Sequence, residues 1–348
     1  MIRNVDMVFE FKNTIPRPPQ TADDMYKQAA SNDTVTVNKW REEWIANVRA
    51  NKERFGNFKD HGVGRLFGIN RYRPCIVVGS GPSLGNSLND TPHESGKPRL
   101  SLKDTKGIMV VSCLHNYQYM VDNNIKVDYY VSLDAGAVVI DEISEGGKLT
   151  HEEYVESTRD KKLIAFVGSN PRLFDNWKGE VYLFNCPVPD ETYMAESFKV
   201  EDFHTMVSTG GNVLGACTYI AKAIFGSNPI IFCGADFCFS YTRKFHAWPS
   251  KYDANIGEAI RCVDVWGNGV LTWGSYYNFK IWFDRLCSNV PEIYINCTEG
   301  GLLGSYPEGN IAAIKQMTLD ECLWSYTMFE EIRQQCEQPE TMEKKVLF

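Results

Sequence analysis

The sequence lacks several patterns that would assign a chemistry directly. It has no C-x-x-C pair, no spacing of cysteine and histidine typical of a zinc site, and no D-x-D motif of many metal-dependent sugar transferases. It has no run of about 18 apolar residues and no signal-peptide core near its start. We therefore expect no membrane span, no resident metal and no tightly bound cofactor.

Positive charge is also scarce, because 36 lysines and arginines face 44 aspartates and glutamates, for a net charge of −8. A general nucleic-acid-binding protein usually presents a basic patch, so we expect no nucleic-acid partner. The eleven cysteines are odd in number, and Cys217, Cys233 and Cys297 lie in apolar stretches. This usage favours reduced core thiols in a cytoplasmic protein over a disulfide framework.

What the sequence does contain is enough apolar material for a substantial core, 43% of 348 residues. Seven short runs have continuous rather than alternating apolar residues, and most end in Gly, Asp, Ser or Asn. Continuous apolarity is typical of strands covered on both faces. The runs are 75–81, 107–113, 128–136, 162–170, 181–186, 229–237 and 292–301. Helical patterns fall between several of them. We predict an α/β fold, a Rossmann-like, doubly wound and mostly parallel sheet.

The N-terminal segment reads differently. Residues 1–35 are mixed in character and contain prolines, which predicts an irregular arm. Trp40 and Trp44 then begin an apolar stripe at helical spacing, and Gly56 is placed to end that helix. We expect this helix to serve packing or an interface rather than a site.

The C-terminal segment is predicted to be helical over 311–340. Helical extensions thus flank the sheet at both ends, and they are candidates for joining copies of the chain into a homo-oligomer. The expected organisation is an N-terminal arm and helix at 1–72, a nucleotide-binding and catalytic domain at 73–305, and a C-terminal helical segment at 306–348.

A glycine-rich loop, Gly79-Ser80-Gly81-Pro82-Ser83, follows the first predicted strand. It fails the G-x-G-x-x-G fingerprint, because leucine stands at the third glycine position, and no G-K-S or G-K-T follows. The two glycines still allow close backbone approach, and Pro82 can open a helix whose first amides would face an anion. A tight strand-to-helix turn would give the same pattern, so both interpretations stand.

A second loop of small residues, Ser208-Thr209-Gly210-Gly211, precedes the clearest helical pattern, over residues 212–226. Small residues before a helix offer N–H groups and hydroxyls to an anion. Ser208 or Thr209 is also expected to cap this helix, which does not exclude binding.

Two aspartates, Asp134 and Asp236, each follow a predicted strand. A carboxylate there is costly to bury unless it is paired or hydrogen-bonded. Asp134 is a candidate for holding a ribose hydroxyl, a metal or a substrate amine, and equally for capping the next turn. If the reaction used Mg²⁺, Asp134 and Asp236 would be its available ligands.

A polar loop after Asp236 carries Arg243, Lys244 and His246. A histidine beside two cations and a carboxylate can act as a general acid or base, so His246 and Asp236 are the candidate catalytic residues. A lone loop histidine is nevertheless more often a surface residue. The two cations are candidates for contacting a substrate or a phosphate.

Polar side chains also gather after the last predicted strand, where Asn296, Thr298 and Glu299 precede two glycines. These three residues are candidates for contacting a substrate or a phosphate. A tightly hydrogen-bonded turn would look the same.

Taken together, five segments resemble the family that contains the flagellar motility accessory factors and the archaeal 6-hydroxymethylpterin pyrophosphokinases. Each segment is a weak match alone, but their shared order makes the resemblance specific over residues 73–301. The segments are 77–84, 122–134, 208–240, His246-Ala247 and 295–301. The core of this family is similar to that of bacterial sialyltransferases that use CMP-activated sugars.

The resemblance implies that the loop Gly79–Ser83 lies at the nucleotide, and that Ser208–Gly211 lies near the phosphate or the sugar. By position, His246 resembles the catalytic base of the sialyltransferase-like enzymes. The family more often has a Gln-Asp pair after the strand, where this sequence has Ala235-Asp236.

The resemblance leaves three functions open. The leading hypothesis is transfer of a nonulosonic sugar from a CMP-sugar donor to a hydroxyl, with His246 as base. The alternative is transfer of pyrophosphate from ATP, with Mg²⁺, to a pterin hydroxymethyl group. The third is a non-catalytic interaction protein that keeps the fold.

Overall fold

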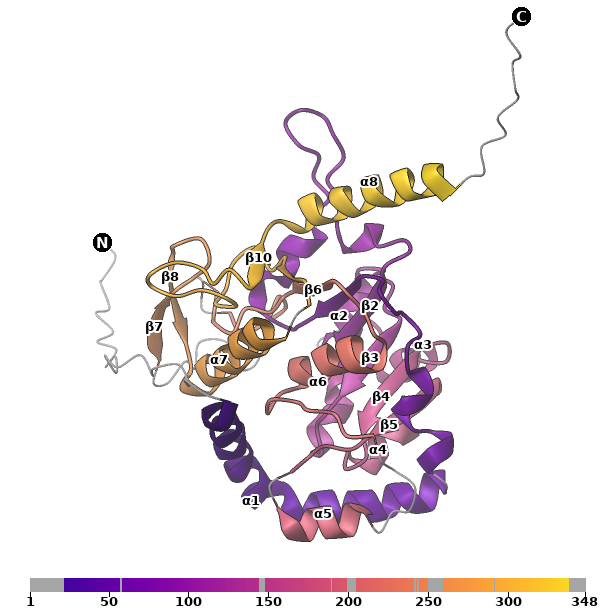
Figure 1. Cartoon of the computed structure of the whole chain (residues 1–348). Coiled ribbons are helices and arrows are strands. Elements are labelled where there is room, and N and C mark those ends of the chain that lie inside the picture. Colours follow the sequence, from indigo (N-terminus) through magenta and orange to yellow (C-terminus); the bar gives the residue numbers. More distant parts are fainter. Residues whose placement is uncertain are drawn as a thin grey trace, which may run out of the picture.

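All seven predicted strands are present in the computed structural model of the chain, and an eighth joins them in one parallel sheet (Figure 1). The strands are β1 Cys75–Val78, β2 Met109–Cys113, β3 Tyr129–Ser132, β4 Lys162–Phe166, β5 Glu180–Phe184, β6 Ile230–Cys233, β9 Tyr294–Asn296 and β10 Ile314–Gln316. The structure describes residues 22–56, 58–143, 148–188, 190–198, 205–240, 242, 244–249, 259–290 and 292–337.

The strand order is β10-β9-β6-β1-β2-β3-β4-β5. The chain therefore builds outward from β1 to β5, returns to pair β6 with the other edge of β1, and continues to β10. In sheets of this kind, ligands bind beyond the carboxyl ends of the strands where the winding reverses. That point lies between β1 and β6, so the loops after these two strands are the first place to look for a site.

The continuous apolar runs are explained by burial. Every residue of β1, β3 and β6 is buried. Helices cover the sheet, so both sets of alternating side chains face apolar surroundings. The predicted α/β, doubly wound and mostly parallel architecture is confirmed.

The helices pack around this sheet. They are α1 Ala22–Phe55, α2 Tyr117–Asp122, α3 His151–Ser157, α4 Pro171–Asp175, α5 Glu191–Phe198, α6 Val213–Tyr219, α7 Gly274–Asn289 and α8 Leu319–Glu337. α6 packs against β1, β2 and β3 and runs into a π-helical turn, η7 Ile220–Ile224. Gly226, at φ +72°, ends this segment, and Gly56, at φ +61°, follows α1, as predicted for both.

Two secondary-structure predictions need correction, and one hairpin was missed. α1 begins at Ala22, so the expected irregular arm is helical over 22–35, and residues 1–21 lie outside the described part of the chain. The segment predicted as helix from 311 contains β10, which pairs with β9. A small antiparallel hairpin, β7 Ile260–Val263 with β8 Gly269–Thr272, was not predicted.

α1 is fixed to the carboxyl end of the sheet by two buried asparagines. The side-chain amide of Asn47 donates to the carbonyls of Ala135, after β3, and Gly168, after β4, at 3.2 and 2.9 Å. The amide of Asn51 donates to two further carbonyls of the β4 loop at 2.8 and 2.9 Å. Because buried amides are costly to leave unpaired, these four bonds set the position of α1 over the loops.

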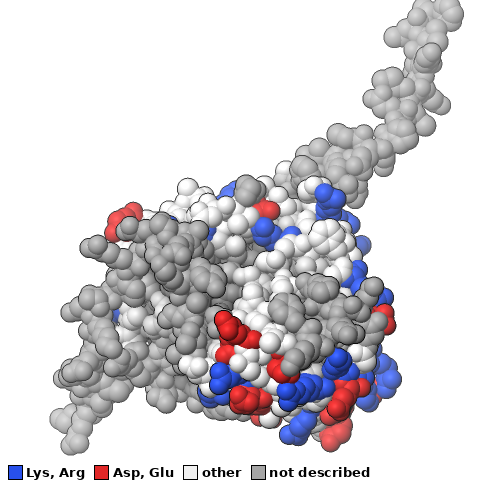
Figure 2. All heavy atoms as spheres, turned by 60° about the horizontal axis from the view of Figure 1, so that its bottom comes forward, with Lys and Arg blue, Asp and Glu red and all other residues white. Residues whose placement is uncertain are grey.

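The outer side of α1 is tied down by ion pairs. Arg41 pairs with Asp190 at 3.1 Å, and Arg49 pairs with Glu196 of α5 at 2.9 Å. α1 and α5 lie at the bottom of Figure 1, and this face comes forward in Figure 2, where basic and acidic side chains are interspersed. On this face the described residues form no patch of one sign.

Two sequence-based expectations concern the whole chain. Among the described residues, no helix is long and apolar enough to cross a membrane. Ten of the eleven cysteines have described side chains; these ten are free, and nine of them are buried. The predicted core location of Cys217, Cys233 and Cys297 is confirmed.

Candidate functional site

The glycine loop after β1 lies against the loop after β6, at the point where the winding reverses. A Cβ on Gly79 would lie 2.5 Å from the carbonyl oxygen of Gly234, and one on Gly234 would lie 2.6 Å from that of Gly79. A Cβ on Gly81 would overlap the carboxylate of Asp236. The two loops therefore pack backbone against backbone, which only glycine allows.

Asp236 organises this contact from a buried position. Its carboxylate accepts hydrogen bonds from the backbone N–H and the hydroxyl of Ser83, at 3.1 and 2.8 Å. Burial raises the pKa of Asp236 to about 7, although the two bonds from Ser83 act in the opposite direction. Asp236 is placed to hold the loop together.

The backbone amides of the glycine loop are mostly committed within the protein. Gly79 N–H donates to Cys233 and Gly81 N–H donates to Gly234, both at 2.9 Å, while Ser83 N–H donates to Asp236. Pro82 is the first residue of the 3-10 helix η3 (Pro82–Leu88), as predicted, and has no N–H. Ser80 is left as the residue of this loop that can turn an N–H and a hydroxyl toward a ligand.

Residues 81–85 also spell G-x-S-x-G, the pattern of a hydrolase nucleophile elbow. In such an elbow, the serine sits at the sharp turn between strand and helix and its hydroxyl meets a histidine. Here Ser83 lies inside η3, and its hydroxyl donates to Asp236. The geometry does not support this serine as a nucleophile.

His246 is held against the same loop. Its Nδ1 lies 2.8 Å from the carbonyl oxygen of Ser80, and its ring stacks on Trp248 at 4.9 Å and lies 4.6 Å from His115. A carbonyl oxygen only accepts, so Nδ1 carries the proton and the lone pair of the neutral ring is on Nε2. The surroundings thus set the tautomer that a general base needs.

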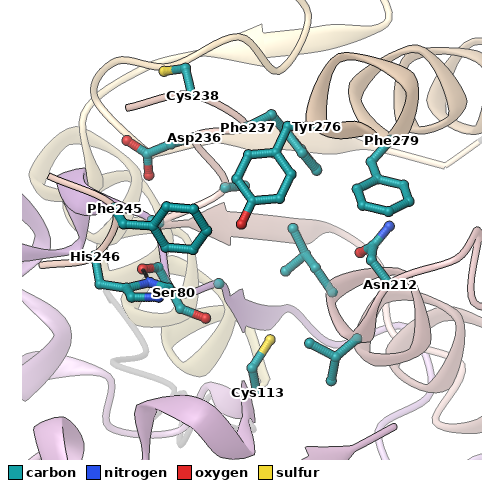
Figure 3. A pocket seen from close by; sticks show the side chains of 16 residues that line it. Ser80, Cys113, Asn212, Asp236, Phe237, Cys238, Phe245, His246, Tyr276 and Phe279 are labelled. Atoms are coloured by element: carbon teal, nitrogen blue, oxygen red, sulfur yellow. Dashed lines mark hydrogen bonds between the residues drawn. The ribbon is translucent and has the colours of Figure 1, made fainter. Parts of the chain in front are cut away.

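Two cavities meet at His246. The smaller, of about 130 Å³, lies directly over the two packed loops and is lined by Gly79, Ser80, Gly81 and Asp236. Figure 3 shows Ser80, Phe245 and His246 on one side of it, Asn212 and Phe279 on the other, and Tyr276 between them.

The larger cavity, of about 510 Å³, extends from His246 toward β3, β4 and β5. The two cavities lie next to each other, since both are lined by Ser80, Asn212, Val213, Phe245, His246 and Tyr276. The far wall is made by α1, through Val37, Trp40 and Trp44. This helix, which we expected to serve packing or an interface rather than a site, thus also lines the main cavity.

The loop Ser208–Gly211 does not supply the cap of α6 that the sequence predicted. The cap of α6 is Asn212, whose side-chain oxygen accepts from Gly215 N–H at 2.9 Å, and neither Ser208 nor Thr209 caps it. Thr209 and Gly211 line the larger cavity, with the Thr209 hydroxyl accepting from Gly211 N–H at 3.2 Å.

Gly210 and Ser208 line neither cavity. Gly210 is buried at φ +58°, and a Cβ there would lie 2.5 Å from the ring of Trp282. Its role in the structure is to let the loop pass that ring.

Asp134 differs from Asp236 in exposure. It lies beyond the end of β3, is exposed, and lines the larger cavity, with one oxygen accepting from Gly136 N–H at 3.2 Å. Among the described residues, no cluster of three or more His, Cys, Asp or Glu side chains that could hold a metal is found. The buried carboxylate of Asp236 accepts two hydrogen bonds from Ser83. A Mg²⁺ ion bound by both Asp134 and Asp236 would have to displace that contact.

The polar residues after β9 are brought to the sheet end but line neither cavity. Thr298 Oγ1 accepts from Ala235 N–H at 3.1 Å, and Asn296 donates to Gln316 of β10 at 2.9 Å. Glu299 accepts from the guanidinium of Arg99 at 3.1 Å. These bonds tie together β6, β9 and β10, as expected for a tightly hydrogen-bonded turn.

Of the two cations predicted to contact a substrate or phosphate, the structure describes only Lys244. Lys244 is exposed and lines neither cavity, and its backbone closes a turn with Ser240. Arg243 lies outside the described residues.

Sequence reasoning missed several residues of this site. Asn116, buried three residues after the end of β2, donates to the carbonyl of Gly79 at 3.1 Å and so fixes the start of the glycine loop. Phe245 and Tyr276 line both cavities. Phe245 carries no local chemical signal, whereas the asparagine three residues after an apolar strand was a usable one.

Comparisons with known proteins fit this architecture. The structure of the MAf glycosyltransferase from Magnetospirillum magneticum AMB-1 is similar, with a TM-score of 0.50 and 16% sequence identity. The likeness covers 79% of this chain and 41% of that chain, and at this identity it shows a shared fold. No curated protein matches the sequence. The profile of the family described as 6-hydroxymethylpterin diphosphokinase MptE-like matches residues 49–242, more than half of the chain, and the protein belongs to this MptE-like family.

Proposed function

We propose that the protein is a transferase that moves a sugar of the nonulosonic type from a CMP-sugar to an acceptor hydroxyl. The observation that carries the proposal is the position of His246, at the junction of the two cavities and bonded through Nδ1 to the glycine loop. The fold that this chain shares with a glycosyltransferase supports it.

In the proposed reaction, Nε2 of His246 accepts the proton of the acceptor hydroxyl. The acceptor oxygen then bonds to the anomeric carbon of the sugar while the bond from that carbon to the phosphate oxygen breaks, and CMP leaves. The gain from such a positioned base is about 10² to 10⁴-fold. Ser80 and the hydroxyl of Thr209 are donors in the described lining that we assign to the leaving phosphate.

A second candidate is pyrophosphate transfer from ATP to a pterin hydroxymethyl group, which the description of the family favours. This reaction would use Mg²⁺ between the phosphates and one or two carboxylates. Asp134, exposed in the larger cavity, fits that role better than the buried Asp236. The two candidates share one geometry, in which a hydroxyl approaches a phosphate-bearing donor beside His246.

Ligand-induced stabilisation separates the candidates, because a ligand that binds the native state raises its apparent stability. The melting temperature would be measured with CMP, CDP, GTP and ATP with Mg²⁺. We expect CMP and CDP to raise it. A rise only with ATP and Mg²⁺ would favour pyrophosphate transfer, and no rise with any nucleotide would support a non-catalytic interaction protein.

The role of His246 is tested by His246→Asn, since the asparagine amide can still donate to the Ser80 carbonyl but cannot act as a base. With a CMP-sugar donor, we expect turnover to fall by about 10² to 10⁴-fold while CMP still raises the melting temperature. His151→Asn is the matched control, because His151 lies on α3 and contacts Asn176 at 2.8 Å, outside both cavities. Unchanged turnover in His246→Asn would rule out the proposed base.

A further inference from the structure

The larger cavity has an aromatic wall that the family profile does not cover. Trp40 and Trp44 belong to α1, and the profile match begins at residue 49. Trp44 is engaged by other rings, with Phe166 and Tyr193 at 5.7 and 5.6 Å. Trp40 instead lies over the loop after β3, where a Cβ on Gly136 would be 3.2 Å from its ring. Trp40 is half-buried, and the exposed Lys39 places its Nζ 4.6 Å from the centroid of this ring. A ligand ring that stacks on this face takes the place of that flexible side chain.

Next to Trp40, the end of β3 supplies two polar groups that face the same cavity. Ser132 is only 2% exposed, and its hydroxyl has no hydrogen-bond partner among the described residues. Asp134, two residues further on, presents an exposed carboxylate. Burying a hydroxyl without a hydrogen-bond partner costs free energy, so we expect a polar group of a ligand to hydrogen-bond with Ser132.

Beside Asp134, the charges in the lining of this cavity disfavour an anionic ligand group. No lysine or arginine lines it in the described part of the chain, and Asp134 is the carboxylate in the lining. A second negative charge near Asp134 in a partly desolvated space would be repelled. A carboxylate only accepts hydrogen bonds, so the matching ligand group carries N–H or O–H donors.

The wall is positioned before any ligand arrives. Asn47, seven residues after Trp40 on α1, donates to the carbonyl of Ala135, the residue that follows Asp134. The helix and the loop are thus bonded to each other through buried groups, and the gap between Trp40 and Asp134 is set by the fold. Such preorganisation lowers the entropy cost of binding.

We infer that Trp40, Ser132 and Asp134 form the acceptor subsite of the proposed transferase, and that it takes an uncharged ring with hydrogen-bond donors on its edge. The ring stacks on Trp40 and donates to Asp134, and a polar atom of its edge pairs with the Ser132 hydroxyl. A sugar ring and an amino-heterocycle both have this chemistry. Trp40, which lies outside the segment matched by the family profile, is then a specificity-determining residue.

Two matched pairs of probes test the subsite by saturation-transfer NMR titration of the full chain. One pair is methyl β-galactopyranoside and its uronate, and the other is 6-hydroxymethylpterin and pterin-6-carboxylate. We expect the neutral member of one pair to bind at least about fivefold more tightly than its anion. Which neutral member binds identifies the source of the ring.

Variants assign the binding to Trp40. Trp40→Ala is expected to raise the dissociation constant by about tenfold or more, and Trp40→Phe by no more than about threefold, because stacking on a ring is largely restored. Asp134→Asn should reduce the preference for the neutral probe. Trp266→Ala is the control, since Trp266 is 51% exposed and lines neither cavity.

Equal affinity for the neutral and anionic members, an unchanged affinity in Trp40→Ala, or no binding of either neutral probe at about 10 mM would overturn the inference. The inference rests on the proposed function, but the two fail separately. If no nucleotide raises the melting temperature but a ring still binds through Trp40, the proposed transferase is wrong and the ring-binding site remains. If a nucleotide binds but neither neutral ring does, only the proposed subsite is wrong.

Discussion

Asp236 and Asp134 each follow a buried parallel strand, yet the structure uses them in opposite ways. Asp236 lies 4% exposed between two backbone loops and is bonded to Ser83, in a cavity of about 130 Å³. Asp134 is exposed at the edge of a cavity of about 510 Å³. A carboxylate after a strand thus marks the ligand-binding edge of the sheet, while the packing of the next loop decides whether it meets the protein or a ligand.

The largest effect on stability is expected where the loops after β1 and β6 pack against each other around Asp236. Gly79→Ala places a methyl group 2.5 Å from the backbone of Gly234, where no side chain can move aside. We expect a loss of about 4 kcal/mol in the free energy of unfolding, measured by chemical denaturation.

Gly85→Ala is the matched control in the next turn, where a Cβ meets only the hydroxyl of Tyr119 at 3.8 Å. Its effect should stay within about 0.5 kcal/mol of wild type. Equal losses in the two variants would show that the loop contact has no special role.

A smaller effect should appear in the pH dependence of stability. The pKa of Asp236 is about 7 in the folded protein and about 3.9 in an unfolded chain, so the folded state binds the additional proton between these values. Stability from this group is fully present below pH 4 and is lost as the pH rises to about 7, with a slope of about −1.4 kcal/mol per pH unit.

Asp236→Asn removes that titration, so the difference in unfolding free energy between wild type and variant gives the slope. A difference that does not change between pH 4.5 and 7, or one that changes in the opposite direction, would show that Asp236 is not held in a raised-pKa environment.

The smallest effect on stability is expected at Asp134, which is exposed in the larger cavity. Asp134→Asn changes an exposed carboxylate whose one hydrogen bond within the described protein runs to Gly136 N–H, and the amide oxygen can keep that bond. The free energy of unfolding should change by less than about 0.5 kcal/mol. A loss comparable with that of a buried group would make Asp134 structural and remove the contrast with Asp236.

Much of the fold could be predicted, because continuous apolar runs report burial on both faces of a strand. All seven predicted strands pair in parallel. The two helices predicted to end at Gly56 and near Gly226 also end there. β10 was missed because only three residues pair, and its sequence, Ile-Lys-Gln, has no apolar run. The hairpin β7–β8 is partly exposed and equally weak in local signal.

The candidate site was predictable in place but not in detail. The pattern put Gly79, Asp236 and His246 near one another, and the structure gathers them around one cavity. It could not show that the glycines serve backbone packing, or that a tryptophan of α1 lines the main cavity. Both depend on contacts between segments far apart in the chain.

The sequence by itself determined the strands, their burial and the edge of the sheet where ligand groups gather, because these follow from local apolarity and from the residues that end each strand. Only the tertiary structure decided which groups remain open to a ligand. The amides of Gly79 and Gly81 and the carboxylate of Asp236 are used by neighbouring loops, whereas Ser80, Asp134 and Trp40 still face a cavity. The physical reason is that a buried polar group must be paired, and its partner is chosen by packing across the whole chain.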